Sequence, residues 1–154
     1  MAGAYETDFR AHPEAYRYDS SEKGVFKVQP YKDELLPDWG FKDEAAAEAS
    51  VEALRARYET YRSQDDFVGM DMVRKYLRMG FTRAMRYAKY SGGRKYEDDG
   101  TERDPEQWAA PEKRAAAVVF RDAWRALTDD PAYQCLKEHH QNAVYDPDAS
   151  PMAE

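Results

Sequence analysis

The segment from Arg74 to Lys95 concentrates positive charge in a chain that is acidic overall. It holds five arginines, three lysines and no acidic residue. These cations are Arg74, Lys75, Arg78, Arg83, Arg86, Lys89, Arg94 and Lys95. Guanidinium and ammonium groups that share one surface bind polyanions, because neutralising several phosphates releases their counterions. Arginine suits this role since it can hold a phosphate with two N–H groups and also stacks on bases.

A helical conformation would gather these cations on one side. At 100° per residue, the cations from Arg74 to Lys89 cover about 180° of a helix, and apolar or small residues fill the other half. Gly80 and Ala84 on that second half would let another helix approach closely. Tyr90 and Tyr96, beside the last cations, could stack on unpaired bases. We therefore predict that the protein binds DNA or RNA without catalysing a reaction. We expect contacts mainly to phosphates and little recognition of base sequence.

Three other interpretations of the basic segment stay open. The whole chain has 23 basic and 30 acidic residues, so the cations could form surface ion pairs with Asp43–Glu44, Glu97–Asp99 or Glu102. They could instead contact the acidic surface of a partner protein. An enzyme acting on a phosphorylated small molecule would use the same cations, but it needs a concave pocket with a carboxylate or histidine near them.

Histidine and cysteine do not form a metal or catalytic motif. His139 and His140 are adjacent, so they point around a helix instead of converging on one ion, and we interpret them as surface residues. Cys135 in AYQCLK is predicted to be a small buried residue. We expect no metal, no cofactor and no catalytic residue.

The carboxylates near the basic segment have structural explanations. Asp65 and Asp66 suit the first turn of a helix, where the helix dipole favours negative charge. Ser63 and Asp66 approximate a capping box. Asp71 precedes Arg74 by three residues and Lys75 by four, which predicts that it orients one of them.

Composition indicates a folded, cytoplasmic protein. Of 154 residues, 42% are hydrophobic and 14% are aromatic, which is enough for a real core. A single cysteine excludes an intramolecular disulfide and fits a reducing compartment. No apolar run approaches the roughly 18 residues of a membrane span, and we expect no membrane association. The oligomeric state cannot be predicted.

The elements that must position these residues are mainly α-helical. Apolar spacing predicts helices near residues 43–62, 65–90, 111–127 and 131–141. We expect one compact helical domain over residues 1–144, with an aromatic-rich N-terminal arm (1–42), a helical body (43–144) and a flexible acidic tail (145–154). Within the arm, VFKVQPY (Val25–Tyr31) alternates and predicts a short strand or hairpin. The predicted core residues are Trp39, Tyr58, Leu77, Phe81, Val119, Phe120, Trp124 and Leu127.

Three blocks of the sequence resemble a known family. They are DFRAHPEAYR (8–17), GVFKVQPYKDELLPDWGFK (24–42) and QDDFVGMDMVRKYLRMGFTRAMRYAKYSGGRKY (64–96). In this order they resemble a family of small proteins catalogued as domain of unknown function number 4385, and the resemblance extends to DPAYQCLKEHH. It implies one intact domain and carries no functional residue over to this chain.

Overall fold

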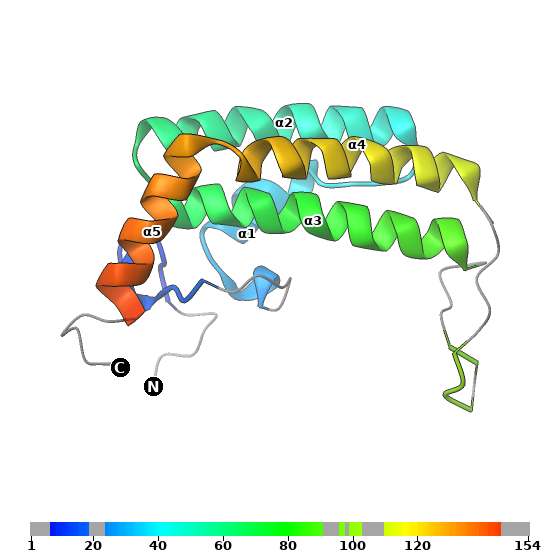
Figure 1. The fold of residues 1–154 in the computed structure, drawn as a ribbon, viewed down its shortest axis with the longest axis horizontal. Helices are drawn as coiled ribbons and strands as arrows, with labels where there is room; N and C mark the ends of the chain where they lie inside the picture. The colour runs from blue at the N-terminus through cyan, green and yellow to red at the C-terminus, as the bar shows by residue number, and fades with distance from the viewer. Residues whose placement is uncertain (1–6, 19–23, 91–95, 98, 103–109, 146–154) are drawn as a thin grey trace.

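Four long helices dominate the computed structural model, which describes residues 7–18, 24–90, 96–97, 99–102 and 110–145. They are α2 (Glu44–Ser63), α3 (Phe67–Lys89), α4 (Pro111–Thr128) and α5 (Pro131–Tyr145) (Figure 1). Ahead of them lie the short α1 (Tyr31–Leu35) and the 3₁₀ turns η2 (Pro13–Ala15), η3 (Val25–Lys27) and η4 (Leu36–Asp38). The predicted mainly α fold is confirmed, with each long helix close to its expected bounds.

The helix starts follow from local chemistry. The Asp43 carboxylate accepts a hydrogen bond from the Ala46 backbone N–H at 2.8 Å and caps α2. Asp66 caps α3 by accepting from the Gly69 N–H at 3.1 Å. The predicted cap at Ser63 is therefore wrong: Ser63 is still the last residue of α2, and the cap falls three residues later.

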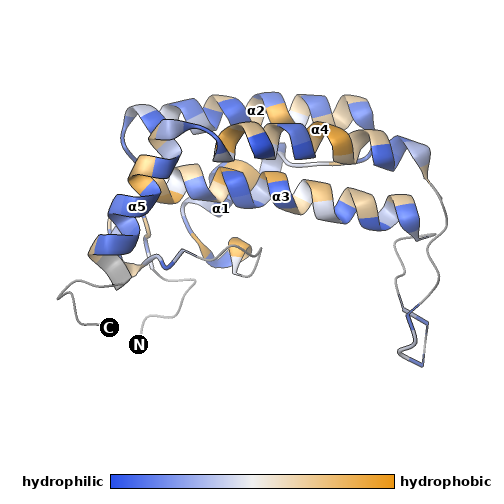
Figure 2. Ribbon diagram, in the orientation of Figure 1, coloured by the Kyte–Doolittle hydropathy of each residue, from blue (hydrophilic) through white to orange (hydrophobic). Residues whose placement is uncertain are grey.

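Helices α2, α3 and α4 pack side by side, with α3 antiparallel to the other two (Figure 1). Helix α5 turns away from α4 and packs against the start of α3 and against η2. Hydrophilic and hydrophobic residues alternate along the three packed helices, as expected for helices with one buried side (Figure 2).

The predicted close approach at Gly80 is confirmed. A Cβ atom on Gly80 would lie 2.5 Å from Cδ1 of Phe120 in α4. Gly69 has the same relation to the Tyr61 ring of α2, at 2.5 Å from Cγ. Both rings are buried, so α3 packs against α2 and against α4 through a glycine that leaves room for an aromatic ring.

The predicted core is confirmed in part. Tyr58, Leu77, Phe120 and Leu127 are buried. The other four predicted core residues are half-buried and pack against that core: Trp39, Phe81, Val119 and Trp124. The helical spacing thus identified the correct side of each helix.

The strand predicted at Val25–Tyr31 is wrong. Val25–Lys27 is a 3₁₀ turn, Tyr31 begins α1, and Gln29 makes an isolated bridge with Asp8. Buried side chains recur every third residue, at Val25, Val28 and Tyr31, which is the period of a turn and not of a strand. Pro30 also has no N–H to donate to a β-ladder.

Among the described residues, no helix is both long and apolar enough to cross a bilayer.

Candidate nucleic-acid interface

The first two cations of the basic segment lie inside the protein. Arg74 and Lys75 are only 3% and 2% exposed. Their predicted position on an exposed cationic surface is therefore wrong. The predicted orienting role of Asp71 is confirmed, because Arg74 Nε donates to Asp71 Oδ1 at 2.6 Å and Arg74 Nη2 to Oδ2 at 3.2 Å.

Two tyrosines complete the cluster around Asp71. Tyr133 of α5 donates its hydroxyl proton to Asp71 Oδ1 at 2.6 Å, and the Tyr16 hydroxyl donates to Oδ2. We call these four residues, Asp71, Arg74, Tyr16 and Tyr133, the buried Asp71 cluster. The fully buried carboxylate thus has one cation and two hydroxyl donors, which is the compensation that a buried charge requires.

Burial and the contacts within the buried Asp71 cluster set the pKa values of its tyrosines and its arginine. Burial and the Asp71 charge raise the pKa of Tyr16 well above its usual value, and the same causes raise the pKa of Tyr133. Burial opposes the charge of Arg74, yet its hydrogen bond to Asp71 and the charge of that carboxylate outweigh burial and raise the pKa of Arg74. Arg74 therefore stays cationic and both tyrosines stay neutral.

The N-terminal arm and α5 cover this part of α3. The Tyr18 ring centroid lies 5.1 Å from Arg74 Cζ, and the Tyr16 ring centroid lies 5.9 Å from Lys75 Nζ. From α5, His140 Nε2 lies 2.7 Å from the backbone oxygen of Tyr16. His140 is consequently buried, which contradicts its predicted surface position.

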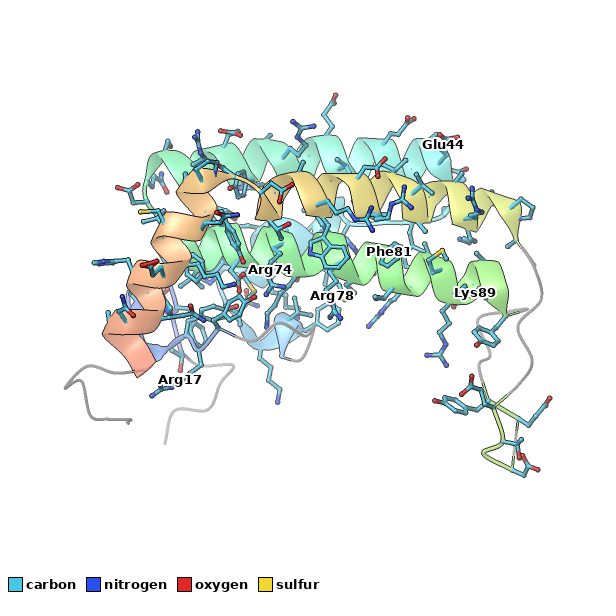
Figure 3. All side chains as sticks on the ribbon, in the orientation of Figure 1. Arg17, Glu44, Arg74, Arg78, Phe81 and Lys89 are labelled. Atoms are coloured by element: carbon cyan, nitrogen blue, oxygen red, sulfur yellow. The ribbon has the colours of Figure 1, made fainter. Side chains whose placement is uncertain are left out.

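The later cations of α3 remain at the surface. Arg83, Arg86 and Lys89 are exposed, and Arg78 is half-buried. We call these four residues the α3 basic surface. Figure 3 shows Arg78 and Lys89 on the part of α3 that α5 does not cover. On the opposite side of the helix, Gly80 packs against Phe120 of α4, and Ala84 is buried.

Aromatic rings lie directly beside the α3 basic surface. Arg83 Cζ is 5.7 Å from the Trp39 ring centroid and 5.9 Å from that of Phe26. Tyr87 is 38% exposed, and its ring lies 5.8 Å from that of Phe41. We call Phe26, Trp39, Phe41 and Tyr87 the ring row.

A further cation from α4 belongs to the same region. Lys113 Nζ lies 5.1 Å from the Phe41 ring centroid and 5.6 Å from that of Tyr87. Sequence reasoning missed Lys113 and all four rings of the ring row, because Lys113 and three of the rings come from α4 and the arm, and Tyr87 was assigned to the packing side of α3. The sequence signal that was available was the density of aromatic residues between Phe26 and Phe41.

The two tyrosines predicted to stack on bases differ in exposure. Tyr90 is 9% exposed and its predicted stacking position is wrong, whereas Tyr96 is 48% exposed. Arg94 and Lys95 lie outside the described residues.

Two predicted acidic partners of the basic segment make local hydrogen bonds. Asp43 caps α2, and Asp99 accepts a hydrogen bond from the Thr101 N–H at 2.9 Å. Glu44 lies on α2, at the opposite edge of the bundle from Arg78 (Figure 3).

Concave sites occur at the other end of α3. A cavity of about 480 Å³ lies between the start of α3 and α5, and its lining includes Asp66, Phe67, Leu136 and His139. A second cavity, of about 390 Å³, is lined by Tyr18, Tyr133, Lys137 and neighbouring residues. Both are remote from Arg86 and Lys89, so neither offers these cations the pocket that a phosphate-processing enzyme would need.

Metal and thiol candidates gain no support from the geometry. Across the part of the chain that is described, no three His, Cys, Asp or Glu side chains gather where they could hold a metal ion. Cys135 is exposed, so its predicted burial is wrong.

The fold and this surface define a helical protein whose central helix carries cations beside aromatic rings. The model of the family described as domain of unknown function (DUF4385) matches residues 2–143, and the chain belongs to this family. Neither the curated proteins nor the solved structures contain a match to it.

Proposed function

We propose that this protein binds nucleic acid, without catalysing a reaction on it, through the α3 basic surface. The observation that carries the proposal is that Arg83, Arg86 and Lys89 project from one exposed half of a helix whose opposite side is packed. Phosphate binding requires several such cations on one surface, since affinity comes mainly from counterion release.

The dimensions of the surface suit a nucleic-acid backbone. Residues 78 to 89 span about 16 Å along the helix axis, which is long enough to meet several successive phosphates. Arg78 and Arg83 are each held near a ring, at 5.9 Å from Trp124 and 5.7 Å from Trp39. Such contacts restrict side-chain motion and so lower the entropic cost of ordering the cations on binding.

The test is a fluorescence-anisotropy titration with labelled DNA and RNA at several salt concentrations. We expect log affinity to fall with log salt concentration with a slope of about −3, as four phosphate contacts predict for a single strand. The double variant Arg86→Glu, Lys89→Glu should lose most of the affinity.

The matched control is Arg55→Glu, Arg125→Glu, which makes the same charge change at exposed positions of α2 and α4. Absence of binding at low salt would overturn the proposal, and so would equal losses in the two double variants. Equal binding of polyglutamate would favour an acidic protein partner instead.

A further inference from the structure

We infer that the nucleic acid is bound as a single strand, with unpaired bases stacked on the ring row; this inference rests on the proposed function. The α3 basic surface alone would suit any polyanion. Three rings of the ring row also pack against the core, but the row presents flat apolar groups beside the cations, and these suit a ligand that offers flat groups in return.

Each pair of rings in the ring row has a cation close to it. Arg83 Cζ lies within 5.9 Å of the ring centroids of Phe26 and Trp39, and Lys113 Nζ lies within 5.6 Å of those of Phe41 and Tyr87. A base that stacks on one of these rings therefore brings its own phosphate close to a cation. Single-strand binding proteins combine the same two elements, a basic track for the backbone and rings for successive bases.

The rings differ in how firmly the fold holds them. Trp39 donates its indole N–H to the Tyr76 backbone oxygen at 2.9 Å, and the Phe26 ring packs edge-on against Tyr76 at 6.3 Å. These two rings fix the position of Arg83. Tyr87 is more than a third exposed, which makes it the ring that can take a base on its outer side.

A duplex does not fit this arrangement. Its bases already stack on each other inside the helix, so the ring row would meet no π-surface and only the cations would contribute. An acidic protein surface likewise supplies carboxylates for the cations but no flat partner for Tyr87. Cations beside aromatic rings therefore favour a single strand over a duplex and over an acidic protein surface.

The test uses three labelled probes of equal length on the full-length protein: oligothymidylate, an abasic strand with the same phosphates, and a duplex. We expect oligothymidylate to bind about tenfold more tightly than the abasic strand, as stacking of a single base predicts. The variant Tyr87→Leu keeps an apolar side chain and should lose about this factor for oligothymidylate alone.

Two further variants sharpen the test. Tyr87→Phe keeps the ring and should bind like the unmodified protein, whereas Arg83→Lys keeps the charge but not the planar group and should weaken oligothymidylate binding. Arg55→Lys on α2 is the matched control for the second change and should have no effect.

The outcomes separate this inference from the proposed function. Equal binding of oligothymidylate and the abasic strand would overturn the stacking inference while leaving phosphate binding in place, and tighter binding of the duplex would overturn it as well. If none of the three probes binds at low salt, the proposed function itself fails. The abasic comparison needs no variant, so it holds even if Tyr87→Leu does not fold.

Discussion

The two halves of α3 use the same kind of residue for opposite purposes. In the first half, Arg74 is buried and held by Asp71, with two tyrosine hydroxyls on the same carboxylate. In the second half, Arg83 and Arg86 are exposed, and Arg83 lies beside aromatic rings. A continuous run of positive charge in the sequence thus becomes an internal ion pair followed by an external surface.

The difference comes from what covers each half. The arm residues Tyr16 and Tyr18, together with α5, lie over the first half. The second half is bordered by Trp39 and Phe41, and its cations Arg83, Arg86 and Lys89 are exposed. A charge run on a helix therefore indicates a binding surface only where the rest of the chain leaves it uncovered.

The largest expected effect tests the buried half. Asp71→Asn would remove the charge that pairs with buried Arg74, and we expect a loss of about 3–5 kcal/mol in the free energy of unfolding. Lys89→Ala, in the exposed half, should change it by less than about 0.5 kcal/mol. Urea denaturation measures both, and similar values for the two variants would abolish the distinction between the halves.

A second prediction concerns the packed side of the exposed half. Gly80→Ala would place a methyl group 2.5 Å from the buried Phe120 ring, and we expect a loss of about 1–3 kcal/mol from overpacking. Gly40→Ala is the control, because a Cβ there would meet nothing within 4 Å. Thermal unfolding of the two variants should differ clearly; a Gly80→Ala protein as stable as the control would mean that the α3–α4 contact can shift.

Two tyrosine hydroxyls on α5 and α3 give a finer comparison. Tyr133→Phe removes a hydrogen bond to the Asp71 charge and should cost roughly 1.5 kcal/mol. The buried hydroxyl of Tyr76 has no hydrogen-bond partner among the described residues, so Tyr76→Phe should be neutral or stabilise by up to about 1 kcal/mol. Chemical denaturation of the pair checks that only Tyr133→Phe is destabilising; a large loss in Tyr76→Phe would indicate that this hydroxyl is in fact bonded.

The smallest effect concerns acid pH and the ion pairs of the arm. Arg10 donates two hydrogen bonds to Glu34, at 2.7 and 2.9 Å; these bonds, aided by one from Tyr61, outweigh burial and hold the pKa of Glu34 below its ordinary value of 4.5. A lowered pKa in the folded state stabilises the protein above pH 4.5, and this stabilisation is lost as pH falls through the folded-state pKa.

The variant Glu34→Gln tests that pH dependence. It should be less stable than the unmodified protein at neutral pH and should lose less stability on acidification, as measured by thermal unfolding across a pH series. Parallel pH profiles for the two proteins would show that Glu34 does not contribute.

The long helices could be predicted because their signals are local. The apolar stripe from Ala47 to Tyr61 and the proline at position 111 each act within a few residues. The Asp71–Arg74 pair was predictable for the same reason, since three residues separate its members. The prediction of a strand at Val25–Tyr31 was wrong because a short alternation of apolar and polar residues does not distinguish a strand from a 3₁₀ turn.

The burial of Arg74 and Lys75 could not be predicted from the helix alone. It depends on Tyr16, 55 residues before Asp71, and on Tyr133, 62 residues after it. The ring row escaped prediction for the same reason, since it joins arm residues such as Trp39 to Tyr87 of α3. Whether a side of α3 is buried or exposed depends on the arm and on α5. No local sequence pattern in α3 indicates where those segments pack.

The long sequence separations within the buried Asp71 cluster also bear on the order of folding. Contacts between segments so far apart close large loops, so they form late compared with the packing of helices that follow one another along the chain. We expect the Tyr133–Asp71 bond to be absent from the folding transition state. Tyr133→Phe would then speed unfolding and leave the refolding rate unchanged in stopped-flow measurements. In that case the buried Asp71 cluster determines the unfolding rate, and so the lifetime of the native state, but not the folding rate.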